Sequence, residues 1–240
     1  MNIIKKITQS RFIIKEYLKE EWDVSTIQDY SENEISKMYS TKKDAEITFG
    51  EASGCNFSVN HKELHWHKLH VIYYNFPEIG KSSVKITKDC AKKINKLYET
   101  ILEPEDSVIV IITEPITENL LNAFEDLYKN GQEYLSTQYD INHDLKDYEL
   151  RHLRNIHLFQ LDHLTKDIRK NIYVPKHESI RKSHNIQQIL SDTNSNQTQL
   201  PSIKRTDIQS KILRLAPGDI CKIIRKTETG GEIPYFRICK

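Results

Sequence analysis

Apolar and polar residues alternate along the first 160 positions in a pattern that predicts helices and strands in turn. Over residues 88–102 apolar side chains recur every three or four positions, with lysines on the opposite side, as in an amphipathic helix. The same period predicts a second helix over residues 117–129. Between them, residues 107–112 form a continuous apolar, β-branched run, which is typical of a strand buried on both faces.

Two further helices are predicted near the N-terminus. Apolar positions over residues 11–20 would place Phe12 on the inner face of one of them. The second begins at Ser31, because Ser31 and Glu34 have the spacing of a capping box. In such a box the hydroxyl and the carboxylate each accept a hydrogen bond from an otherwise unpaired backbone N–H.

Two strands complete the predicted pattern of the first domain. Residues 69–76 and 155–159 have the length and apolar content of strands, and helices separate them from the central run. Alternating strands and helices favour an α/β layer with parallel pairing. Residues 130–150 are polar and lack a clear period, so we expect an inserted segment there.

The C-terminal part of the chain has a different character. Val174-Pro175 predicts an extended segment, since the residue before proline disfavours the helical region. A short helix follows over residues 183–190. Strands are predicted over 220–225 and 234–238, and Gly230-Gly231 between them supplies the positive φ that a hairpin needs. This pattern predicts a small α+β domain.

Composition narrows the classes of function. The chain has 240 residues, 38% hydrophobic and 29% charged, which suits a folded globular protein. A net charge of +1 gives no overall attraction to nucleic acid, and no apolar run approaches the length of a membrane helix. The four cysteines are far apart and form no C-x-x-C motif, which favours a reducing compartment.

Two clusters of residues suggest binding chemistry, and both have a simpler explanation. His61, His65, His67 and His70 are dense, but no cysteine or carboxylate has the usual spacing of a zinc ligand set. A polar hairpin face explains them, so no metal and no other cofactor is predicted. Thr229-Gly-Gly231 lacks the lysine of a phosphate loop and does not lead into a helix, so a hairpin turn explains it.

Short motifs follow one another in order through the C-terminal part. They are Val174-Pro-Lys-His177, Leu200-Pro201-x-Ile203, Asp207 with Lys211 and Leu215, Gly218, Lys222-Ile-Ile-Arg225, Glu228-Thr229-x-Gly231 and Phe236-Arg237. In order and spacing this set resembles the C-terminal half of the fifth subunit of eukaryotic nuclear RNA polymerases. It equally resembles the small archaeal RNA polymerase subunit that corresponds to that half.

The N-terminal part resembles the jaw domain of the eukaryotic subunit more weakly. The matching features are the helix containing Arg11, the segment Phe76-Pro77-Glu78, Gly80, and Val84-Lys85. The resemblance implies a restriction-endonuclease-like sheet with flanking helices over residues 1–165, and an assembly domain over 166–240. Isoleucine after Asp207, where the family has proline, and other departures favour a large DNA virus or a divergent protist as the source.

The resemblance implies a non-catalytic polymerase subunit. Its C-terminal domain would dock on the largest subunit, its jaw would help to hold downstream duplex DNA, and no membrane or small-molecule ligand is implied. The residues implied at the subunit interface are Pro175, Lys176, His177, Asp207, Gly218, Lys222, Arg225, Thr229, Gly231 and Arg237. Those implied near DNA are Thr117, Glu118 and Asn119, although an acid at 118, where the family has proline, argues against direct contact. The subunit would work in the virion and host-cell cytoplasm if viral, and in the nucleus if cellular.

Alternatives stay open at this stage. Arg225 could be a solvated cation at a strand end, and His177 could make only a local hydrogen bond. A nuclease of the same fold would need acids on the central strand, yet residues 107–112 carry none, and Glu105 and Asp106 precede it. A free-standing transcription adaptor is the third possibility.

Overall fold

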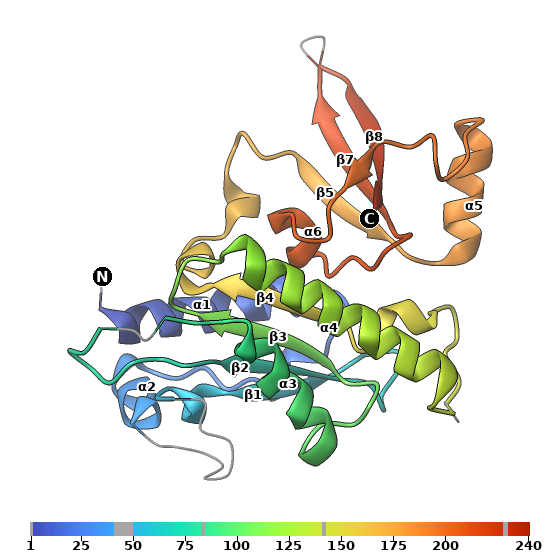
Figure 1. Cartoon of the computed structure of the whole chain (residues 1–240). Coiled ribbons are helices and arrows are strands. Elements are labelled where there is room, and N and C mark those ends of the chain that lie inside the picture. Colours follow the sequence, from blue (N-terminus) through green and yellow to red (C-terminus); the bar gives the residue numbers. More distant parts are fainter. Residues whose placement is uncertain (1, 41–49, 83–84, 141–142, 228–229) are drawn as a thin grey trace. The chain divides into compact units, whose positions relative to one another are not determined.

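The computed structural model of the chain describes residues 2–40, 50–82, 85–140, 143–227 and 230–240. The chain folds into two compact units (Figure 1). The first unit comprises residues 1–141 and 153–166, and the second comprises residues 142–152 and 167–240. Within the described residues, no helix has the length and apolar character needed to cross a membrane.

A mixed sheet forms the centre of the first unit. Its strands lie in the order β1 (Phe57–Asn60), β2 (Lys68–Tyr73), β3 (Ser107–Ile112) and β4 (Ile156–Gln160). β1 pairs antiparallel with β2, whereas β2, β3 and β4 are parallel. Every residue of β3 is buried, as expected for the middle strand of a covered sheet. The predicted α/β layer with parallel pairing is therefore confirmed.

Helices cover the sheet of the first unit on both faces. α3 (Asp89–Thr100) and α4 (Glu118–Thr137) pack their apolar sides against one face, in a single hydrophobic cluster with the strands. α1 (Ile3–Leu18) is tied to the other face, where Ser10 Oγ and the Tyr73 hydroxyl lie 2.9 Å apart. The remaining elements of this unit are α2 (Glu32–Tyr39) and the short 3-10 helices η1 (Val24–Thr26), η2 (Ser53–Cys55) and η4 (Leu161–Leu164).

Three helix predictions can be compared with these elements. The capping box is confirmed, since Ser31 N donates to Glu34 Oε2 at 2.8 Å and Glu34 N donates to Ser31 Oγ at 3.4 Å. The inward position of Phe12 was wrong: its side chain is 57% exposed, because α1 begins at Ile3 and its buried stripe passes through other positions. α4 continues to Thr137, so residues 130–137 of the expected insertion are helical.

The second unit contains a sheet of four strands in the order β5 (Lys176–Ile180), β7 (Ile220–Lys226), β8 (Glu232–Cys239) and β6 (Ser202–Ile203). β7 and β8 form the predicted hairpin, with Lys226 opposite Glu232 next to its turn. The helices of this unit are α5 (Ser183–Asp192), α6 (Ile208–Ile212) and the 3-10 helices η3 (Leu150–His152) and η5 (Ile168–Lys170).

Alternate residues of β7 belong to different hydrophobic clusters. Cys221 and Ile223 pack with Leu215, while Ile220 packs with Ile186 of α5. This alternation is the period of two that a strand imposes on its side chains. Ile223 therefore packs on the opposite side of β7 from Ile220.

Segment 142–152 joins the second unit through a buried carboxylate. Asp219 is fully buried, and its Oδ1 lies 2.9 Å from His152 Nε2 and 3.4 Å from Arg151 Nη2. Its Oδ2 accepts from Ala216 N at 2.9 Å and lies 3.8 Å from Arg181 Nε. A buried charge needs such partners, so Asp219 fixes this segment to the turn before β7.

Candidate partner-binding site

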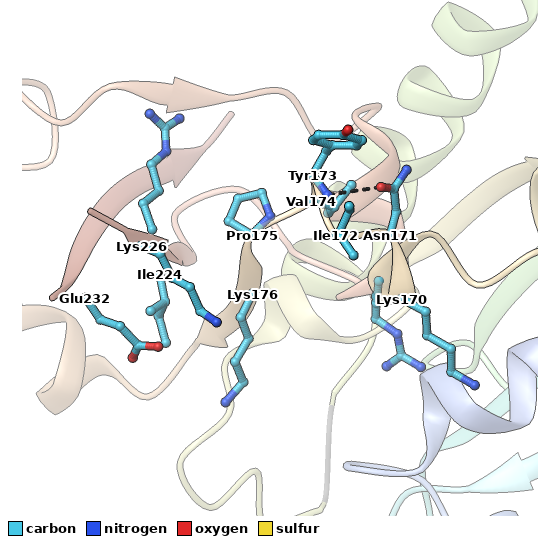
Figure 2. A pocket seen from close by; sticks show the side chains of 12 residues that line it. Lys170, Asn171, Ile172, Tyr173, Val174, Pro175, Lys176, Ile224, Lys226 and Glu232 are labelled. Carbon is cyan, nitrogen blue, oxygen red and sulfur yellow. Dashed lines mark hydrogen bonds between the residues drawn. The ribbon is translucent and has the colours of Figure 1, made fainter. Parts of the chain in front are cut away.

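A cleft of about 840 Å³ opens in the second unit between the segment before β5 and the outer end of the β7–β8 hairpin (Figure 2). Residues 169–176 line one side of it. Ile224, Arg225, Lys226 and Glu232 line the other. The cleft therefore brings together residues that lie about 50 positions apart in the chain.

Local turn chemistry shapes the first side of the cleft. Asn171 Oδ1 accepts a hydrogen bond from Tyr173 N at 3.0 Å, and Asn171 O accepts one from Val174 N at 2.9 Å. Pro175 then holds the chain extended into β5, which begins at Lys176. His177 Nδ1 lies 2.7 Å from Pro175 O, a local contact that agrees with the simpler of its two interpretations.

The lining of the cleft is predominantly basic. Among the described residues that line it, Glu232 is the single acidic one, against five basic ones: Arg169, Lys170, Lys176, Arg225 and Lys226. Arg169 forms a bidentate pair with Asp167, whose side chain is 8% exposed, and Lys176 pairs with Glu178 at 2.6 Å. Lys170, Arg225 and Lys226 form no ion pair within the described residues. The cleft therefore favours a ligand with negative charge.

Exposed apolar side chains accompany these charges. Ile172 is 89% exposed and Tyr173 is 87% exposed, on the turn that lines the cleft. On β8, Ile233 and Tyr235 are also exposed, and the Arg225 guanidinium carbon lies 4.8 Å from the Tyr235 ring centroid. Tyrosine and arginine are enriched in protein interfaces, so this composition suits a protein partner better than a small metabolite.

Three of the residues expected at the interface line this cleft, namely Pro175, Lys176 and Arg225. Lys222 borders it indirectly, since Glu178 lies between the two lysines, 2.6 Å from Lys176 Nζ and 3.3 Å from Lys222 Nζ. The hydrogen bond from Lys176 lowers the pKa of Glu178, and Lys222 adds to the effect. A chain of alternating charge therefore continues from the cleft across β5 and β7.

Asp207 and Arg237 lie elsewhere in the unit and make local hydrogen bonds. Asp207 is the N-cap of α6 and accepts from Gln209 N at 2.8 Å. Arg237 Nη1 donates to Ser202 O at 3.1 Å, which links β8 to β6. These contacts give both residues a role within the unit itself.

The two glycines expected at the interface shape the backbone. Gly218 has φ +92° and donates from its N–H to Cys239 O at 3.0 Å. A Cβ on Gly218 would lie 2.1 Å from Arg151 Nη1. In the hairpin the positive φ belongs to Gly230, at +85°, whereas Gly231 N donates to Thr227 Oγ1 at 3.0 Å. Thr229 lies outside the described residues.

The residues expected near DNA lie together at the start of α4. Thr117 is its N-cap, with Leu120 N donating to Thr117 Oγ1 at 3.4 Å. Glu118 and Asn119 follow in the exposed first turn. A helix N-terminus favours anions, but Glu118 already places a carboxylate there and would repel a phosphate.

Three of the four histidines have separate polar partners, although the rings of His61 and His67 stack with their centroids 5.9 Å apart. His61 Nδ1 accepts from Leu64 N at 3.1 Å, His67 Nε2 lies 3.0 Å from Ser107 Oγ, and His70 Nε2 lies 2.9 Å from Asp106 Oδ2. Through the described part of the chain, no group of three or more His, Cys, Asp or Glu side chains is placed to hold a metal ion.

The acids before β3, which a nuclease would use, have local partners. Asp106 also accepts from Lys68 N at 3.1 Å and from Glu103 N at 3.2 Å. The pKa of Tyr139 is raised to about 12 by burial first and then by its hydrogen bond with Glu105. These acids therefore stabilise the turn leading into the strand.

Sequence reasoning missed several residues of the cleft, above all Lys170, Ile172, Tyr173 and Lys226. Their signal was present, because the apolar pair Ile172-Tyr173 stands between basic residues and a proline in a segment without periodicity. Nothing in the sequence showed that the hairpin end would lie across from it.

Comparison with known proteins bears on the second unit. Residues 166–239 match the family described as RNA polymerase Rpb5, C-terminal domain. DNA-directed RNA polymerase subunit Rpo5 of Nitrosopumilus maritimus is 43% identical over 67 residues, which are 28% of this chain and 80% of that protein.

Two other archaeal proteins of the same name show the same pattern. The Archaeoglobus fulgidus subunit is 37% identical over 71 residues, 30% of this chain and 92% of its own length. The Methanothermobacter thermautotrophicus subunit is 35% identical over 75 residues, 31% of this chain and 96% of its own length. The family match leaves residues 1–165 outside it.

Proposed function

This chain belongs to the family of the fifth subunit of DNA-directed RNA polymerase, and from this premise we propose that it is a non-catalytic polymerase subunit that docks on the largest subunit through its basic cleft. The observation that carries the proposal is the match of residues 166–239, because this stretch contains every cleft residue. The cleft's five cations and its exposed Ile172 and Tyr173 support docking on an acidic protein surface.

A role for the first unit forms the second part of the proposal. It would help to hold downstream DNA, with Thr117, Glu118 and Asn119 closest to the duplex. The exposed start of α4 supports this placement, and the Glu118 carboxylate limits it to proximity rather than tight phosphate binding. Tight binding of duplex DNA would then require the assembled complex and not this chain alone.

The test is recovery of large partners with the tagged full-length chain. The unmodified chain is expected to bring down chains several times its mass in equal amounts. The double variant Lys170→Glu/Lys226→Glu should recover them several-fold less, since it reverses two charges in the cleft. Lys19→Glu/Lys204→Glu reverses two exposed lysines outside the cleft and serves as the matched control.

Two outcomes would contradict the proposal at different levels. Recovery of the chain alone, with no large partner, would argue for a free-standing adaptor and against a subunit. Equal recovery by both double variants would keep the subunit assignment but remove the cleft as its docking site.

A further inference from the structure

Arg154 is a buried cation in the first unit with few partners. It lies two positions before β4, has φ +48°, and its N–H donates to Glu105 O at 2.8 Å. Its side chain is 7% exposed, and arginine is seldom buried this far unless a carboxylate accompanies it. Among the described residues Arg154 forms no ion pair, and its guanidinium makes one hydrogen bond, from Nη2 to Asn95 Oδ1 at 3.1 Å.

The surroundings of Arg154 hold the guanidinium in one place. Its central carbon lies 3.9 Å from the ring centroid of Tyr98 and 5.5 Å from that of Tyr134. A Cβ on Gly131 would lie 2.7 Å from Arg154 Cδ, so this glycine in α4 leaves room for the arginine stem. Stacking on rings occupies the faces of a guanidinium and leaves the N–H groups at its edge available.

Arg154 lines a cleft of about 500 Å³ between the C-terminal halves of α3 and α4. Arg154 Nε is buried without a hydrogen-bond partner in the described structure, and it faces Gly131, whose added Cβ would lie 2.7 Å from it. A ligand would therefore meet the Nη end of the guanidinium. The amides of Asn130 and Gln138 also line the cleft. On its rim, Glu99 and Glu133 are exposed, and neither forms an ion pair within the described residues.

We propose that this cleft binds a segment of a partner protein in which an acidic residue lies next to a basic one. The partner's carboxylate would enter between the two tyrosines and accept hydrogen bonds from the Arg154 guanidinium, the geometry for which arginine is best suited. The neighbouring lysine or arginine would pair with Glu99 or Glu133 on the rim. The site lies in the first unit and does not depend on the basic cleft of the second.

The distribution of charge favours this occupant over nucleic acid. A nucleic acid backbone repeats its negative charge at every phosphate, so it would bring further anions against Glu99 and Glu133. A peptide with one acid and one base matches the buried cation and the rim carboxylates at the same time. The size of the cleft suits a pair of side chains rather than a long strand.

The test uses the isotope-labelled full-length chain and short peptides with blocked ends. One peptide contains adjacent glutamate and lysine, and its control has glutamine in place of glutamate. The Arg154 Nε–Hε resonance should move in a saturable way with the first peptide, with a Kd on the order of millimolar. The glutamine peptide should bind roughly tenfold more weakly or worse, because a charge-assisted hydrogen bond is lost.

Two variants separate binding from folding. Glu99→Gln/Glu133→Gln alters only exposed rim positions, so the fold should persist while affinity for the acidic–basic peptide falls several-fold. Arg154→Lys keeps the charge but loses the planar guanidinium with its paired N–H donors. It should abolish the difference in affinity between the glutamate and glutamine peptides.

Equal affinity for the glutamate and glutamine peptides would overturn the proposal. A saturable shift with inorganic phosphate or duplex DNA that matches or exceeds the peptide's would also overturn it, in favour of a general anion site. No saturable shift with any probe would assign Arg154 a purely structural role.

Discussion

At the scale of single residues, one turn of the second unit requires a residue without a Cβ atom. Gly218 adopts φ +92°, and Arg151 passes where its Cβ would lie. The next residue, Asp219, is the buried carboxylate that Arg151 and His152 approach. A side chain at 218 would therefore have two effects: it would strain the backbone, and it would displace Arg151 from Asp219.

Gly218→Ala and Gly230→Ala form a matched pair that separates these two effects. Gly230 has φ +85° with open space around it, so alanine there should cost only the backbone strain, about 1–2 kcal/mol. Gly218→Ala should lower the free energy of unfolding by clearly more than Gly230→Ala, because Arg151 must also move. Chemical denaturation of the two variants measures this difference, and equal losses would show that Arg151 yields without cost.

Lys211 provides a prediction about pH. It is buried, and desolvation lowers its pKa to about 8, while Asp207 acts in the opposite direction. Because the unfolded chain holds this proton up to about pH 10.4, folding is opposed below pH 8 and the cost disappears as pH rises toward 10. Lys211→Met should therefore be more stable than the parent at pH 7.

The difference in unfolding free energy between Lys211→Met and the parent should shrink between pH 8 and pH 10. Comparing the two chains removes the contributions of other groups, such as Cys221, whose pKa burial raises to about 11. Denaturant titrations at each pH give the two free energies. A difference that stays constant with pH would mean that Lys211 keeps its proton in the folded chain.

At the scale of elements, α4 begins where its sequence indicates. Thr117 caps the helix, and Glu118 follows in its first turn, where a negative charge is favourable. Thr117, Glu118 and Asn119 are also the exposed residues proposed to lie near DNA. A change at Thr117 would therefore alter both helix stability and any contact with the duplex.

Thr117→Ala and Thr117→Ser distinguish these contributions. Alanine removes the cap and should lower the free energy of unfolding by about 1 kcal/mol, whereas serine keeps the hydroxyl and should cost little. Thermal unfolding of the two variants provides the measurement. If both retain parental stability, the 3.4 Å bond to Leu120 N contributes nothing measurable.

Elements with a strong local signal were predictable from the sequence. The buried run at β3, the capping box of α2 and the hairpin with Gly230 follow from the period and turn chemistry of adjacent residues. The end of α4 was not predictable, because residues 130–137 are polar and Gly131 is a weak helix former. The need for glycine at position 131 comes from Arg154, 23 positions later in the chain, whose side chain occupies the space of a Cβ.

The candidate site shows the same division between local and distant information. Pro175, Lys176 and Arg225 were expected from the resemblance, and they line one cleft. Asp207, Gly218 and Arg237 belong to the same sequence pattern but make hydrogen bonds inside the unit. Sequence alone does not separate these groups, because a motif records both the residues that bind and those that support them.

At the scale of the whole molecule, the second unit is assembled from two separate stretches. Residues 142–152 precede β4 of the first unit in the chain, yet they belong with residues 167–240. Their attachment includes Lys182 Nζ to Asp147 Oδ2 at 2.8 Å as well as the contacts with Asp219. The archaeal relatives match about 30% of this chain, a length close to the second stretch alone.

A fragment of residues 166–240 should therefore be less stable than the same region in the full chain. Without Arg151 and His152, Asp219 loses two of its four partners, and breaking buried charge pairs costs up to about 3–5 kcal/mol. Hydrogen exchange at the β7 amides in both forms measures the loss. Asp219→Asn should cost less in the fragment than in the full chain, and equal costs would show that segment 142–152 adds nothing to this site.

The threading of the chain through both units also sets an order on biosynthesis. As the polypeptide leaves the ribosome, residues 142–152 emerge well before β7 and Asp219 exist, and β4 follows them at once. The first unit can close its sheet during translation, whereas this early stretch of the second must wait until β7 and β8 have been made. Emergence of β8 from the ribosome is then the earliest moment at which the C-terminal unit can be complete and its cleft ready for a partner.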